Sequence, residues 1–282
     1  MFHMELFTSS IASGTTTPQQ VTYFTPDNIL PKQVNGVQIS PDLPFLMAVM
    51  GVGANLATVR IQMASFLPFP YINLSPNNRG TAFESPPRIW DFSAHPIPLK
   101  PTEELDIFAT QNLGTPQTEF VACLFSDAKP NPLGVSLNPA KLTSIASDPG
   151  RFFTAHWTFG TALTAGQWSI VQPSFDFPLY AGTYALVGAR VMSATALFFR
   201  MFPAQGPKWR PGGIAVQNYD QIDAYNQRLF SPYGTTPAGW AVWLTFYQNV
   251  PPQVEIFATA ADPSGEGWFD LVYLGPSVAP SI

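Results

Sequence analysis

One short sequence occurs twice in this chain, roughly half a chain length apart. Residues 105–110, Leu-Asp-Ile-Phe-Ala-Thr, recur at residues 254–259 as Val-Glu-Ile-Phe-Ala-Thr. After a Gly-containing turn, the apolar segments 120–124 and 269–273 follow at the same spacing. Because the flanks match as well as the identical centre, the repeat predicts one fold present twice. The alternative is convergent β-strand patterning in two unrelated sandwiches.

A second match lies upstream and has a different offset. Leu56–Ile61 can be aligned with Leu186–Val191, where the offset between the copies is smaller by nineteen residues. An insertion in the second copy would produce this change. Residues 205–239, rich in Gly, Pro, Asn and Gln, are the predicted place for it.

Each of these upstream segments contains a single arginine in an otherwise apolar run, Arg60 in one and Arg190 in the other. A lone cation in such a strand is expected to reach water or to meet a carboxylate. Asp106 and Glu255, in the matching repeated strands, are the candidate partners. These ion pairs are predicted either within a domain or as bridges between subunits.

Composition favours short strands and an extensively covered surface. The 282 residues include 30 Pro and 20 Gly, which interrupt helices, and 46% are hydrophobic, enough for a core in each half. Only 11% are charged, less than half the usual share. A surface with so little charge predicts an assembly subunit, and the alternative is a surface rich in Ser, Thr, Asn and Gln.

The sequence lacks the patterns of several other function classes. The net charge is −5 and the basic residues are scattered singly, which argues against direct nucleic-acid binding. His3, His95 and His156 are far apart and in no metal-binding spacing, and Cys123 lies in an apolar strand. We therefore expect no enzyme activity, no metal and no cofactor. No basic segment of a secretory signal precedes Lys32, which favours synthesis in a cytoplasm.

The predicted fold class is all-β, with two tandem eight-stranded jelly rolls, long loops and a short linker helix. The predicted organisation is an N-terminal arm at 1–20, a first jelly roll at 21–127, a linker with a short helix at 128–150, and a second jelly roll at 151–282 with a loop insertion around 205–239.

Two such rolls in one chain resemble the double jelly-roll major capsid proteins of tailless icosahedral viruses, of the small membrane-containing bacteriophage type. The resemblance covers nearly the whole chain and rests on strand pattern rather than on signature residues. It implies a homotrimer that forms a pseudo-hexagonal capsomer and tiles an icosahedral shell. Minor capsid and vertex proteins would be its partners, and the virion its location after synthesis in the host cytoplasm.

The resemblance also implies a role for the N-terminal arm. In several relatives the chain termini face an internal lipid membrane, which makes the apolar side chains of the arm a candidate inner contact. These side chains are Phe2, Leu6, Phe7 and Ile11.

A rival hypothesis is a carbohydrate-binding or receptor-binding double β-sandwich of a phage. Its motivation is the loop-borne aromatic residues Trp90, Trp209 and Tyr233, since aromatic rings suit the faces of sugars.

Overall fold

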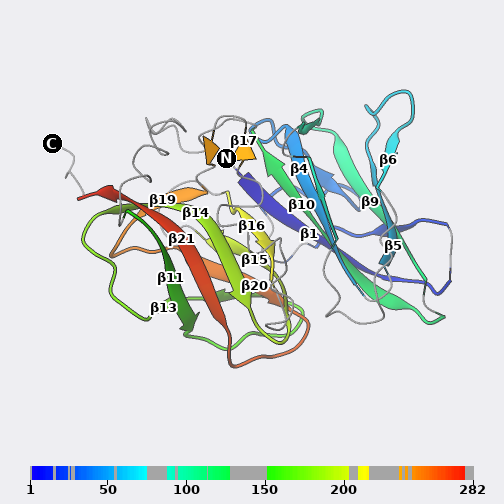
Figure 1. Ribbon diagram of the computed structural model, residues 1–282. Helices are drawn as coiled ribbons and strands as arrows, with labels where there is room; N and C mark the ends of the chain where they lie inside the picture. Colours follow the sequence, from blue (N-terminus) through cyan, green and yellow to red (C-terminus); the bar gives the residue numbers. More distant parts are fainter. Residues whose placement is uncertain are drawn as a thin grey trace. The chain divides into compact units, whose positions relative to one another are not determined.

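The computed structural model divides the chain into two compact units, which we describe separately (Figure 1). One unit spans residues 3–128, and the other spans residues 129–282 together with residues 1 and 2. The structure describes residues 2–14, 17–24, 26, 29–53, 56–74, 88–92, 95–112, 114–127, 151–202, 209–215, 235–236, 239–240 and 243–276.

Ten strands belong to the first unit. They are β1 (Phe2–Ile11), β2 (Gln19–Val21), β3 (Val37–Gln38), β4 (Phe45–Val52), β5 (Leu56–Gln62), β6 (Tyr71–Asn73), β7 (Arg88–Asp91), β8 (Ile97–Pro98), β9 (Glu104–Gln111) and β10 (Gln117–Ser126). One sheet has the order β1-β10-β4-β7, with β8 also paired to β4, and the other has the order β2-β9-β5-β6, with β3 also paired to β9.

The second unit contains the remaining strands. They are β11 (Phe152–Phe159), β12 (Trp168–Val171), β13 (Pro173–Phe175), β14 (Thr183–Met192), β15 (Ala196–Phe202), β16 (Gly212–Ile214), β17 (Thr235–Thr236), β18 (Gly239–Trp240), β19 (Leu244–Tyr247), β20 (Gln253–Ala258) and β21 (Glu266–Gly275). The sheets have the orders β13-β11-β21-β14-β19 and β12-β20-β15-β16, and β17 pairs with β18.

The two units have the same strand topology. When the short accessory strands β3, β8, β13, β17 and β18 are set aside, eight strands remain in each unit. Numbered in chain order, they lie one-eight-three-six in one sheet and two-seven-four-five in the other, in both units. This interleaving of two Greek keys defines a jelly roll. The predicted all-β fold with two tandem jelly rolls is therefore confirmed.

Other parts of the prediction fall where the structure gives no description. Among the described residues there is no helix, and none that could cross a membrane. The predicted linker helix lies within 128–150, outside the described residues, as does most of the predicted insertion at 205–239.

The downstream half of the predicted repeat is confirmed, and the upstream half is wrong by one strand. Residues 105–110 and 254–259 fall on β9 and β20, which are both seventh strands, and the segments that follow form the eighth strands β10 and β21. Leu56–Ile61 lies in β5, a fourth strand, whereas Leu186–Val191 lies in β14, a third strand. The fourth strand of the second unit is β15. Neighbouring apolar strands share one hydrophobic pattern, so the pattern could not distinguish them.

The N-terminal segment is a strand of the first unit, not an arm. β1 lies beside β10 at the edge of its sheet, and Phe24 N donates a hydrogen bond to the carbonyl oxygen of Leu6. Its apolar side chains Phe2, Leu6, Phe7 and Ile11 are at most 4% exposed. The expected arm and its membrane contact are therefore wrong for the folded chain, because these side chains already fill the protein interior.

The glycine that follows β4, on the other side of β10, has a structural explanation. β4 and β10 pair in antiparallel register, and nearly every residue of both is buried. Just after β4, Gly53 lies against the buried carboxylate of Glu119, and a Cβ at this position would collide with it. The glycine is thus explained by a close approach of the backbone to this side chain.

Truncating a side chain of β1 should destabilise the first jelly roll. Leu6 is 1% exposed, so Leu6→Ala should cost about 2–5 kcal/mol through lost burial and an unfilled cavity. The thiol of Cys123 on β10 is fully buried and reports unfolding of this unit. When refolding is faster than labelling, the rate at which a thiol reagent labels Cys123 is proportional to the unfolded fraction. This rate should therefore be at least about 30-fold higher in Leu6→Ala, since each 1.4 kcal/mol changes the unfolding equilibrium tenfold. Val34→Ala is the matched control, because Val34 is 78% exposed. Equal labelling rates in both variants would show that β1 is an arm after all.

Candidate functional site

One face of the sheet β11-β21-β14 in the second unit carries polar side chains. Their positions alternate with core residues, because successive side chains of a strand point to opposite faces. The register places Thr154 opposite Asp270, and places His156 and Arg190 on either side of Trp268. We call this surface the second-domain polar face. Its members are Thr154, His156, Asp176, Arg190, Glu266, Trp268 and Asp270.

At one end of this face, Asp270 joins two neighbouring strands. Its Oδ1 lies 2.6 Å from Nη2 of Arg190 on β14 and accepts a 2.7 Å hydrogen bond from the hydroxyl of Thr154 on β11. Burial raises the pKa of Asp270, and the bonds from Arg190 and Thr154 only partly oppose this. The ion pair therefore compensates a carboxylate that the sheet has removed from water.

At the other end, His156 lies between two carboxylates. Its Nδ1 is 2.7 Å from Oδ2 of Asp176, and its Nε2 is 2.9 Å from Oε2 of Glu266. Both ring nitrogens can donate together only in the imidazolium form. Burial alone would lower the pKa of His156, but the bonds to Glu266 and Asp176 outweigh it and raise the pKa above its ordinary value.

This cluster does not form a metal site. The carboxylates contact opposite nitrogens of one ring, so the three groups do not converge on a shared point. Across the described part of the chain, no three His, Cys, Asp or Glu side chains are placed to hold a metal ion. The arrangement instead ties β11, β21 and the segment after β13 together.

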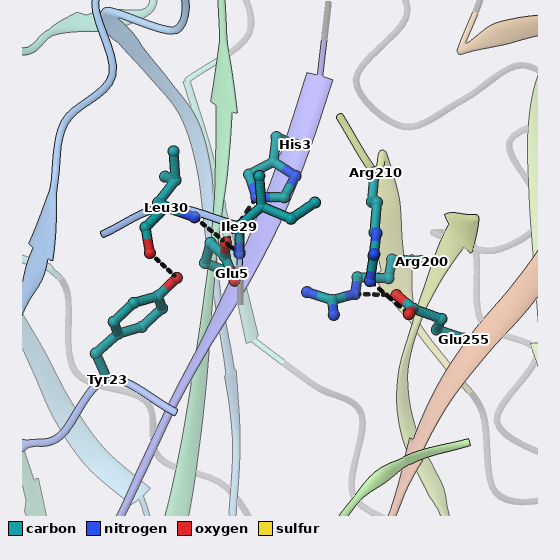
Figure 2. A network of polar contacts seen from close by, with 8 residues as sticks. All are labelled: His3, Glu5, Tyr23, Ile29, Leu30, Arg200, Arg210 and Glu255. Atoms are coloured by element: carbon teal, nitrogen blue, oxygen red, sulfur yellow. Dashed lines mark hydrogen bonds and ion pairs between the residues drawn. The ribbon is translucent and has the colours of Figure 1, made fainter. Parts of the chain in front are cut away.

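A buried ionic cluster connects strands of the other sheet in the second unit (Figure 2). Arg200 on β15 lies directly opposite Glu255 on β20, and its Nε is 2.5 Å from Oε2. Nη1 of Arg210 lies 2.5 Å from the other oxygen of Glu255. The guanidinium of Arg200 also stacks over the ring of Trp168, 4.2 Å from its centroid. Arg200 and Glu255 are at most 2% exposed, so their charges are compensated within the protein.

The first unit has its own buried polar network, on β1 (Figure 2). Oε1 of Glu5 lies 2.7 Å from Nε2 of His3 and accepts hydrogen bonds from the backbone N–H groups of Ile29 and Leu30. The hydroxyl of Tyr23 donates to the carbonyl oxygen of Leu30. These bonds hold the loop after β2 against β1, which the sequence did not predict.

The predicted partners of the two arginines are wrong. Arg190 meets Asp270 rather than Glu255, because β14 and β20 belong to different sheets. Arg60 lies opposite Phe108, and its Nε donates to Oδ1 of Asn73 on the edge strand β6. Its guanidinium stacks over Tyr71, 4.3 Å from the ring centroid.

The two predicted carboxylates have also diverged between the copies. Asp106 lies opposite Gln62 and accepts a 2.7 Å hydrogen bond from the side chain of Gln20, whereas Glu255 holds two arginines. Burial raises the pKa of Asp106, with a smaller contribution from Glu104. The prediction of bridges between subunits stays a prediction.

Each unit also exposes an apolar loop. The first-domain aromatic patch comprises Phe66, Leu67, Pro68 and Phe69 on the connection between β5 and β6, and Tyr71 at the start of β6. The second-domain aromatic patch comprises Phe177, Pro178, Leu179 and Tyr180, on the connection between β13 and β14. Exposed fractions are 87% for Leu67, 64% for Phe69, 80% for Phe177 and 82% for Tyr180.

A hollow lies beside each patch. The hollow of the first-domain patch has a volume of about 450 Å³ and is completed by Ile72 and the segment 98–100. The hollow of the second-domain patch has a volume of about 480 Å³ and extends to Thr154, His156 and Asp176 of the polar face. Exposed apolar groups of this size next to a concavity are typical of interaction surfaces.

The aromatic residues that motivated the carbohydrate hypothesis do not form such a surface. Trp90 is 8% exposed and Trp209 is 5% exposed, so neither ring presents a face to solvent, and Tyr233 lies outside the described residues. In both patches an exposed phenylalanine stands directly beside a proline, Phe69 beside Pro68 and Pro70 and Phe177 beside Pro178. This juxtaposition in residues 66–71 and 175–180 is a sequence signal that could have identified the patches.

Comparison with known proteins gives weak matches of fold. No family model and no curated protein sequence matches the chain. Among solved structures, the major capsid protein P2 of Bacteriophage PM2 matches with 10% identity, a TM-score of 0.25, and coverage of 99% of this chain and 100% of that one. The STIV MCP matches with 8% identity, a TM-score of 0.24 and coverage of 97% of each chain.

A protein with another role gives a similar TM-score. The glycoside hydrolase domain of Endo-D from Streptococcus pneumoniae R6 has 10% identity and a TM-score of 0.25, covering 94% of this chain and 33% of that one. TM-scores this low support no argument about function. The classification of the fold rests on the strand order of the chain itself.

Removing the carboxylate of the buried ionic cluster should destabilise the second jelly roll. Glu255→Leu leaves Arg200 and Arg210 without this counter-charge and should cost about 3–5 kcal/mol. Ile170→Ala is the control, because Ile170 lies opposite Glu255 on β12 but is 46% exposed, and should change stability by about 0.5 kcal/mol or less. Urea unfolding of both variants measures the difference. A cost for Glu255→Leu no greater than that of the control would contradict the assigned role.

Titration should detect the charged state of His156. Its folded pKa is raised, so a value above about 6.5 is expected by NMR, and Asp176→Asn and Glu266→Gln should each lower it. The contribution of His156 to the stability of the second unit is therefore complete below the pKa that His156 has in the unfolded chain. It is lost as the pH rises through the pKa that His156 has in the folded chain. His156→Gln should remove this pH dependence from urea unfolding of the second unit. A folded-state pKa of His156 at or below about 6.5 would refute the charged pairing.

Proposed function

We propose that this chain is a viral major capsid protein, which trimerises into pseudo-hexagonal capsomers and tiles an icosahedral shell in the virion. The observation that supports this most is the duplication: two jelly rolls of identical strand order in one chain. A homotrimer of such chains contains six similar barrels. The threefold axis relates three copies, and the two like barrels of each copy make the six edges of the capsomer nearly equivalent. A capsomer with six similar edges can be surrounded by six neighbours in a hexagonal lattice.

The surface of the chain is consistent with this role. Charged residues make up only 11% of the sequence, and each unit exposes an apolar loop on its surface. Obligate interfaces are commonly larger than about 2,000 Å² and less charged than other protein surface. Minor capsid and vertex proteins would be further partners in the shell. The work of the chain in this proposal is assembly rather than catalysis, and it requires neither a cofactor nor contact with nucleic acid.

The proposal predicts a stable homotrimer. Light scattering of the purified chain should give three times its 30.8 kDa mass, with little dissociation on dilution because the interface is obligate. Electron microscopy at high concentration should show sheets or closed shells of hexagonal units. A chain that stays monomeric at high concentration, with no lattice in any condition, would overturn the proposal.

One observation favours a second candidate, the binding of a carbohydrate. The hollow beside Phe177 and Tyr180 combines apolar walls with the polar groups of His156 and Asp176, as sugar sites do. Glycan-array binding by a discrete oligomer that forms no lattice would favour this candidate, provided that Tyr180→Ala abolishes the binding.

A further inference from the structure

We propose that the second-domain aromatic patch of one copy docks on the first-domain aromatic patch of a neighbouring copy, so that copies associate head to tail. This inference rests on the proposed function, since it assumes that the chain assembles with itself. It adds the identity of the contact surfaces, which strand topology alone does not provide.

The first argument is exposure. Leu67 and Phe69 in one patch and Phe177 and Tyr180 in the other are at least 64% exposed, although few large hydrophobic side chains of the described residues are exposed. Contiguous exposed apolar groups rimmed by polar residues commonly mark protein interaction sites. Large aromatic residues also dominate the energetics of such contacts. A surface of this kind on each unit is expected to be covered in the assembled protein.

The second argument is shape. Each patch combines protruding side chains with an adjacent hollow, of about 450 Å³ in the first unit and about 480 Å³ in the second. The side chains of Leu67 and Phe69 could enter the hollow beside Tyr180, while Tyr180 and Phe177 cover the hollow beside Leu67. Aromatic or aliphatic anchors inserted into facing pockets are typical of the centre of a stable interface.

The third argument is charge, which selects unlike rather than like pairing. The first-domain patch is bordered by Arg60 and by Lys100, which forms an ion pair with Glu103. The second-domain patch is bordered by Asp176 and Glu266, which both contact His156. Counting these described groups, and with His156 charged, the first border carries one net positive charge and the second one net negative charge. Unlike borders attract, whereas two copies of the same border repel.

Pairing of two different surfaces has a defined geometric consequence. A contact between unlike patches is heterologous, so it generates a closed ring or an open filament rather than a twofold dimer. A ring of three copies satisfies the proposed capsomer and covers every patch in the assembly. No patch is then left exposed.

Cysteine cross-linking between separate copies tests the contact. Leu67→Cys and Tyr180→Cys are made as two separate proteins, unfolded and refolded as a mixture, and treated with a short bis-maleimide. The native Cys123 is fully buried, and burial raises the pKa of its thiol, so it should remain unreactive. We expect a cross-linked heterodimer in the mixture and none in either protein alone. Val34→Cys mixed with Tyr180→Cys is the matched control, since Val34 is 78% exposed but lies outside both patches.

The double variant Leu67→Cys/Tyr180→Cys reports the number of copies in the ring. Cross-linking should end at a closed covalent trimer, resolved by denaturing mass spectrometry. A closed ring of another size would support the contact and overturn the proposed capsomer. Trimers seen by light scattering without the heterodimer would leave the proposed function standing and overturn this contact. Homodimers of Tyr180→Cys alone would also overturn it, because they require like patches to meet.

Discussion

The structure depends on the insertion of the last strand of each unit into the middle of a sheet. β10 lies between β1 and β4, and β21 lies between β11 and β14, so each final strand holds the first strand in place. These pairings join residues more than a hundred positions apart, as in Thr154 opposite Asp270. Backbone hydrogen bonds and buried side chains on both flanks stabilise a strand in this position. The first strand of the chain therefore belongs to the core rather than to a tail.

The two jelly rolls share this framework but satisfy the matching carboxylates differently, one of them half-buried and the other fully buried. At the same place in the repeat, Asp106 receives a hydrogen bond from Gln20, whereas Glu255 receives two arginines. A buried carboxylate is costly without a donor, but several kinds of donor can satisfy it. The duplicated strand order has thus been kept while its polar contacts have changed.

Much of the fold was predictable from the sequence, and the site was not. The repeat around Ile107 and Ile256 identified the seventh and eighth strands of both units, because apolar alternation and spacing survive in the primary structure. The third and fourth strands were confused, since Leu56–Ile61 and Leu186–Val191 have similar apolar patterns. The predicted carboxylate partners of Arg60 and Arg190 were also wrong. A partner depends on strand order and register, and a register shift of one residue moves every side chain to the other face.

By itself, the sequence determined the class of fold and its duplication. Low charge, frequent proline and a repeated apolar strand favour two β-sandwiches over helix-rich folds. Only the tertiary structure decided which polar groups meet. His156 contacts Asp176 and Glu266, twenty and 110 residues away in the chain, because β11 lies between β13 and β21. It also decided that Phe2 is buried while Phe177 is exposed, although the two side chains are identical. Local patterning sets which residues can form strands, but burial and pairing arise only when distant strands share a sheet.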